Sequence, residues 1–173
     1  MSKTKQLKPG YPVVGDNGAI TCMTIDEIAK RVGDKLGVQR ASYSLPKEGG
    51  WLRIARVNTD SAIILFTNDY IGAIGRGVML EYSGCYDPSQ CDAIFAFGST
   101  TLFSKVRFVG NKAEIYLEIY VDAKSASTPI SMTLISSRHK ETASLYDKYQ
   151  EGAVSEGFSV KELTRADLMN RGG

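Results

Sequence analysis

Residues 105–122 read KVRFVGNKAEIYLEIYVD, and the second half of this stretch alternates between apolar and polar side chains. The apolar positions are Ala113, Ile115, Leu117, Ile119 and Val121; the polar positions are Glu114, Tyr116, Glu118, Tyr120 and Asp122. Because successive side chains of a strand point to opposite faces of a sheet, this pattern predicts a half-buried strand. Gly110-Asn111 predicts a two-residue hairpin turn back to a strand at 105–109. We expect Glu114 and Glu118 to form a solvated carboxylate ladder.

Strand patterns continue on both sides of this hairpin, from Val38 onward. Further strands are predicted at 50–57, 62–67, 78–83, 93–97 and 130–136. Residues 138–149 could be a loop, a helical turn or a strand, and the weak alternation at 158–163 could close the sheet. About seven or eight short strands without βα alternation predict a mainly β fold, an antiparallel β-sandwich or jelly-roll-like domain over 38–165. Residues 166–173 are predicted to be a loose C-terminal tail.

The amino-terminal part differs from the rest of the chain. Residues 1–23 are rich in Pro, Gly, Asp and Asn, which predicts an irregular attachment segment with a tight turn at 16–18. Residues 24–37 are predicted to form a short amphipathic helix that begins with a Thr24–Glu27 capping box. Its single apolar stripe consists of Ile25, Ile28, Val32 and Leu36. So narrow a stripe is typical of a bundle seam, which predicts an oligomer interface. Packing against the chain's own sheet is the alternative.

Composition excludes several classes of protein. With 173 residues, of which 43% are hydrophobic and 23% charged, the chain fits one globular domain. A formal charge of +2 gives no field that would favour nucleic acid. No apolar run is long enough for membrane insertion and no secretory signal is visible, so we expect synthesis in a cytoplasm. Cys22, Cys85 and Cys91 are then expected to be thiols, although pairing of Cys85 with Cys91 stays open.

Residue patterns of catalytic and metal sites are not found. His139 is the only histidine, which excludes a zinc site built from several imidazoles, and it lies in a polar stretch without a nucleophile elbow. The glycine-rich residues 72–77 match neither a dinucleotide fingerprint nor a P-loop. We therefore expect no enzyme activity, no catalytic residue and no metal or cofactor. A surface-glycan hydrolase or esterase is the weakest alternative, since it would need His139 or a buried carboxylate pair.

Aromatic residues give the one hint of ligand recognition. Trp51, Tyr82, Tyr116 and Tyr120 could stack on the apolar face of a sugar while Arg53 or Glu118 hydrogen-bonds its hydroxyls. Such rings are also common on half-exposed sheet faces for packing reasons alone. A carbohydrate-binding module without catalysis is therefore an alternative function.

Four strings of residues resemble a known family. They are GWLRIA at 50–55, KVRF at 105–108 with AEIYLEIY at 113–120, EGAVSEGFSVKEL at 151–163, and the linker-like NGAITCMTIDEIA at 17–29. Together they are similar to the C-terminal knob-type β domain of fibre and appendage proteins from tailed phages of gut Bacteroidota, the crAss-like phages included. Leu52 and Ser155 stand where that family often has Tyr and Pro.

The resemblance implies a phage virion structural protein, a short head or tail fibre or a comparable appendage. It implies a β-sandwich knob that is usually a homotrimer, is made in the cytoplasm of a bacterial host and is located on the virion. Other virion proteins would bind the N-terminal segment, and a host surface glycan is a further expected partner. The family supplies no catalytic residues. Whether the location is head or tail stays open.

Overall fold

The structure is a computed structural model that describes residues 11–14, 20–23, 37–57, 61–68, 78–84, 86–98, 103–123, 129–136 and 143–169. Nearly all the elements in these ranges are strands. They are β1 (Tyr11–Val14), β2 (Ile20–Met23), β3 (Val38–Ser44), β4 (Gly50–Val57), β5 (Ser61–Asn68), β6 (Val78–Ser83), β7 (Asp92–Gly98), β8 (Lys105–Gly110), β9 (Ile115–Val121), β10 (Pro129–Ser136), β11 (Ala143–Glu151) and β12 (Ser159–Thr164). A 3-10 turn, η1 (Pro88–Gln90), precedes β7, and a short helix, α2 (Arg165–Met169), follows β12.

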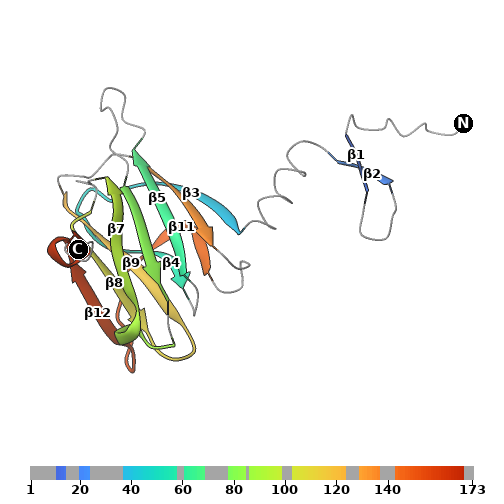
Figure 1. The fold of residues 1–173 in the computed structure, drawn as a ribbon. Helices are drawn as coiled ribbons and strands as arrows, with labels where there is room; N and C mark the ends of the chain where they lie inside the picture. Colours follow the sequence, from blue (N-terminus) through green and yellow to red (C-terminus); the bar gives the residue numbers. More distant parts are fainter. Residues whose placement is uncertain are drawn as a thin grey trace, which may run out of the picture.

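Ten of these strands form an antiparallel β-sandwich, as the alternating sequence pattern predicts (Figure 1). One sheet has the order β3-β10-β5-β6-β7 and the other the order β11-β4-β9-β8-β12. Several neighbours are far apart in sequence, such as β3 with β10 and β4 with β11. The fold therefore depends on long-range pairing, which a shared apolar core must stabilise.

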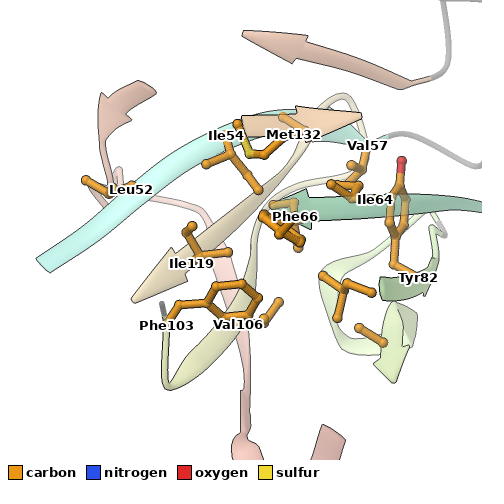
Figure 2. Close-up of a cluster of buried hydrophobic side chains, with 14 of the residues drawn as sticks. Leu52, Ile54, Val57, Ile64, Phe66, Tyr82, Phe103, Val106, Ile119 and Met132 are labelled. Carbon is orange, nitrogen blue, oxygen red and sulfur yellow. The ribbon is translucent and has the colours of Figure 1, made fainter. Parts of the chain in front are cut away.

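The core lies between the two sheets and contains one side-chain set from each (Figure 2). Ile54, Val106 and Ile119 come from one sheet, and Phe66 and Met132 from the other; all are at most 1% exposed. Fully burying such a side chain contributes roughly 1.5–3 kcal/mol, so this layer supplies most of the driving force for folding.

One side of the sandwich is closed by side chains that bond across from β3 to β11. The Gln39 amide donates to the Ala143 carbonyl at 2.7 Å and accepts from the Leu145 amide at 2.9 Å. The Tyr43 hydroxyl donates to the Tyr146 carbonyl at 2.6 Å. β11 is an edge strand, so these bonds satisfy backbone groups that its pairing with β4 leaves free. Tyr146 lies in the irregular stretch of β11 that follows Leu145.

The amino-terminal segment contains a hairpin where the sequence predicts irregular chain. β1 and β2 pair with Val14 opposite Ile20, so the breakers between them fall in the connection. Pro12 is tolerated because a two-stranded sheet has only edge strands. The predicted turn at 16–18 and helix at 24–37, except its last residue, lie outside the described residues, as do His139 and the glycine-rich residues 72–77.

The predicted two-residue turn of the central hairpin is wrong. β8 and β9 pair Gly110 with Ile115, so a four-residue connection replaces the expected two-residue turn. The Asn111 side chain accepts from the Ala113 and Glu114 amides, and this Asx turn makes the longer connection favourable.

The predicted loose tail begins with a helical turn. Asp167 accepts from the amide and hydroxyl of Thr164, which caps α2. Leu168 in α2 is only 1% exposed, so burial of this side chain holds the turn against the sandwich. Residues 170–173 are outside the described part of the chain.

Cys91 follows η1 and is buried, with its Sγ 3.6 Å from the Asp87 carbonyl oxygen. Cys85 lies outside the described residues, so the redox state expected for this pair stays a prediction.

Candidate functional site

The most distinctive polar feature is a row of three charges across the outer face of one sheet. β9 runs between β4 and β8, and the strand registers place Arg53 and Arg107 directly opposite Glu118 on its two neighbours. The bulge in β4 falls just after Arg53, so this strand keeps Arg53 outward and still turns both Ile54 and Ala55 inward. An acid between two bases on adjacent strands is a favourable cross-strand arrangement.

The three side chains form a compact ionic cluster. Arg53 reaches Glu118 Oε1 with both Nε and Nη2 at 2.9 Å, and Arg107 reaches Oε2 with the same two nitrogens at 2.7 Å. The Glu118 side chain is 0% exposed. The predicted solvated carboxylate ladder is therefore wrong at this position: the alternation gives the correct face, but other parts of the chain cover it.

Aromatic rings cover the guanidinium groups. The Arg107 Cζ lies 4.1 Å from the Trp51 ring centroid, and the Arg53 Cζ lies 4.0 Å from that of Tyr116. Trp51 also makes an edge contact with Tyr120, with ring centroids 5.3 Å apart. Stacking of this kind stabilises a desolvated arginine through the ring quadrupole.

Residues 152–158 complete the cover; we call them the crossing segment. They join β11 to β12, which are opposite edges of the same sheet, so they pass over its outer face. The Gly152 amide donates to the Trp51 carbonyl at 2.8 Å. Arg53 donates to the Ala153 carbonyl at 2.7 Å, and Arg107 donates to the Gly152 carbonyl at 3.4 Å. The arginine protons left over from Glu118 thus bind the backbone of this segment.

Close contact explains the glycine at the start of the crossing segment. A Cβ on Gly152 would lie 2.6 Å from Glu118 Oε2 and 2.7 Å from the Trp51 Cβ. Real Cβ atoms do not approach other atoms so closely, so only glycine lets the backbone pass over the cluster at this height.

The chemistry of the cluster fits a structural role. Both oxygens of Glu118 are engaged by guanidinium groups, and the residues opposite it on β4 and β8 are bases instead of a second carboxylate. Acid–base catalysis by a carboxylate pair needs one carboxyl with access to substrate. Burial, together with a hydrogen bond to Glu114, raises the pKa of Tyr116 to about 12, so this hydroxyl stays protonated at neutral pH.

The structure brings four of the predicted ligand contacts together but turns them toward each other. Tyr82 instead lies in the core and is 1% exposed, and Glu118 is bound by the two arginines, so these two predicted contacts are wrong. Trp51, Arg53, Tyr116 and Tyr120 lie on the same face and contact one another or the cluster. Sequence reasoning missed Arg107 and Gly152; an arginine in the hairpin at the register position of Glu118 was the available signal. The predicted interface residues Ile25, Ile28, Val32 and Leu36 are outside the described residues.

An open groove of about 410 Å³ lies beside the cluster, at one end of β4. Lys47, Glu48, Tyr149 and Glu151 contribute to its wall, and part of Trp51 lines it. Within the described ranges, no group of three or more His, Cys, Asp or Glu residues is arranged to hold a metal ion. The helical residues in these ranges likewise include no stretch that is long and apolar enough to cross a membrane.

Comparisons of the chain with protein-family models, with curated proteins and with solved structures give no match. The geometry nevertheless connects the strings that carry the phage-fibre resemblance. GWLRIA supplies Trp51 and Arg53, KVRF supplies Arg107, AEIYLEIY supplies Glu118, and EGAVSEGF supplies Gly152. Strings separated by as many as 100 residues therefore meet in one cluster.

Proposed function

We propose that this chain is a structural subunit of a phage virion, a short head or tail fibre or comparable appendage that displays its β-sandwich as a knob. The observation that carries this proposal is the meeting of GWLRIA, KVRF, AEIYLEIY and EGAVSEGF at the Glu118 cluster. Residues that interact with each other in this way are constrained together by the fold. Their shared order with the phage-fibre family is then a likeness of fold, and the role of that family is the natural one to propose.

In this proposal the amino-terminal part assembles and attaches the subunit. The segment at 1–23 binds another virion protein, and the helix at 24–37 packs with the same helix of sister chains around a threefold axis. The sandwich needs no catalytic group. Many displayed copies convert weak single contacts with the host surface into firm attachment, because binding events after the first are effectively intramolecular.

Immunogold electron microscopy tests the virion assignment. Antibodies raised against the purified chain should label intact phage particles from the source of the sequence at a fixed position, head or tail. Antibody absorbed beforehand with the purified chain is the control and should leave the particles bare. Particles without label, in a preparation whose soluble fraction contains the chain, would contradict the proposal.

A carbohydrate-binding module is the second candidate, and the groove beside Trp51 is the observation that favours it. Its wall combines a ring, Tyr149, with the hydrogen-bonding groups of Lys47, Glu48 and Glu151, which suits a sugar. Glycan-array binding that is lost in Glu48→Gln and Tyr149→Ala would support this candidate. Ser155→Ala, on the crossing segment away from the groove wall, is the control and should keep any binding.

A further inference from the structure

The two outer faces of the sandwich differ in character. The outer face of the β11-β4-β9-β8-β12 sheet carries the Glu118 cluster and is crossed by residues 152–158. The outer face of the other sheet presents apolar side chains instead; we call this set the apolar face. It consists of Val38, Ile63, Leu65, Met79, Ile94 and Ile135. Leu65 is 36% and Ile135 is 40% exposed, and the other four are partly buried.

Strand pairing makes the apolar face nearly continuous. Ile135 on β10 lies opposite Val38 on β3 and Ile63 on β5. Leu65 on β5 lies opposite Met79 on β6. Their neighbours along the strands, such as Ile64 and Leu134, are fully buried in the core, so these residues point outward. A contiguous exposed apolar patch on a soluble domain usually marks an interface.

Two opposite charges stand on the same outer face, one at its edge and one within it. Arg40 on β3 and Glu81 on β6 are both exposed. β10 and β5 lie between those two strands, so three strand spacings, or about 14 Å, separate the two backbones. That separation is too wide for a direct ion pair within one chain. Arg40 lies on the edge strand β3, whereas Glu81 lies between Ile63 and Ile94.

We propose that the apolar face is the contact between copies of this chain in the homotrimer, an inference that rests on the proposed function. A cyclic trimer uses a head-to-tail interface in which two different patches of one surface meet. The two separated charges supply such a pair: Arg40 at the edge of one copy binds Glu81 on the face of the next, and the apolar side chains are buried around this contact. Charge complementarity thus selects a second copy of the same chain as the occupant.

The position of this face along the chain fits the same assembly. Val38 opens β3 and immediately follows the segment at 24–37. Sister chains that meet through the apolar stripe of that segment would enter their sandwiches at Val38, on this face. A single seam would then extend from the helices to the knobs.

Sedimentation velocity of the full-length chain and its variants tests the proposal. Leu65→Glu and Ile135→Glu should each weaken self-association by at least about tenfold, because a charge would be buried without a partner. Val160→Glu is the matched control, since Val160 is an apolar residue 43% exposed on β12 of the other sheet. This control should assemble like the unaltered chain. Circular dichroism establishes that each variant is folded.

Charge reversal provides a readout that does not depend on packing. Arg40→Glu alone and Glu81→Arg alone should each weaken assembly, because like charges would meet across the interface. The double reversal should restore assembly, since each new charge again faces an opposite one. Failure of rescue, with both single variants weakened, would overturn the proposed pairing of Arg40 with Glu81.

The remaining outcomes separate this inference from the proposed function. Dissociation by Ile28→Asp with Val32→Asp, but not by the face variants, would overturn the inference and leave the proposed function standing. A monomer whose melting temperature falls in Leu65→Glu would show that residues 24–36 cover the face, which also overturns it. If the purified chain is a monomer but its antibodies still label phage particles, another virion protein would be indicated as the occupant of the apolar face. That result would again overturn the inference.

Discussion

At the scale of the residue, Glu118 shows how a charge becomes a fold determinant. Removing a carboxylate from water costs several kcal/mol, and only close partners offset that cost. Two guanidinium groups bind Glu118. Two aromatic rings and two backbone carbonyls in turn contact these guanidinium groups. A buried ionic group of this kind adds little net stability compared with apolar residues, but its parts cannot be removed singly without leaving a charge unpaired.

Replacing the buried acid should therefore be costly. Glu118→Gln should lower the free energy of unfolding by about 3 kcal/mol, since two arginines lose their counter-charge in a dry environment. Urea denaturation measures the change. Glu162→Gln is the control, because it breaks the exposed Lys105–Glu162 pair, which water screens, and should cost far less. Equal losses in the two variants would contradict the role assigned to the cluster.

Gly152 should tolerate no side chain. Gly152→Ala should lower the free energy of unfolding by about 1–3 kcal/mol, because the new methyl group would press on Glu118 and Trp51. Ser155→Ala, at an exposed position of the same segment, should change it by no more than about 0.5 kcal/mol. Thermal denaturation compares the two, and a harmless Gly152→Ala would mean that residues 152–158 are not held against the cluster.

Tyr116 should ionise late. Its pKa is raised to about 12 by burial and by the Glu114 carboxylate. Because the folded chain keeps this proton more tightly than the unfolded chain, the associated stability is complete below about pH 10 and is lost as the pH rises through about 12. Absorbance at 295 nm follows the titration, and Tyr116→Phe should remove a late component. A Tyr116→Phe curve that loses a component near pH 10 instead would be inconsistent with this environment.

At the scale of the element, alternation predicted the strands that keep a regular register. β9 and β10 are clear in the sequence because every second residue enters the core. β11 was not predictable, because its register shifts between Leu145 and Gln150 and breaks the period of two. The hairpin of β1 and β2 was hidden by Pro12 within β1 and by the Gly, Asp and Asn residues that lie between the two strands in sequence. Burial of Glu118 could not be predicted either, since alternation assigns a face and does not show what crosses it.

The helix predicted at 24–37 should hold the assembly together. Ile28→Asp with Val32→Asp should dissociate the oligomer, because charges would replace the apolar stripe, while the melting of the sandwich stays unchanged. Lys30→Asp, on the opposite side of the predicted helix, is the control and should assemble normally. Size-exclusion chromatography separates the species. An oligomer unaffected by the double substitution would mean that the stripe packs elsewhere.

At the scale of the whole molecule, the two outer faces of the sandwich have different roles. The face that carries the Glu118 cluster contributes to stability, and the apolar face is proposed to contribute to assembly. The face with the Glu118 cluster can be exposed without a partner, because the charged groups of the cluster bind each other and the backbone of the crossing segment. The apolar face opposite would be unfavourable on an isolated subunit. Other copies of the chain would cover it. The knob would then expose only the face with the Glu118 cluster and the ends of the sandwich.

Multi-angle light scattering of the purified full-length chain is the decisive measurement, made over a range of protein concentrations. Assembly through residues 24–37 and the apolar face predicts a stable particle with three times the 18.9 kDa mass of one chain. A species of 18.9 kDa at every concentration would contradict the trimer and, with it, the display of this sandwich as a fibre knob.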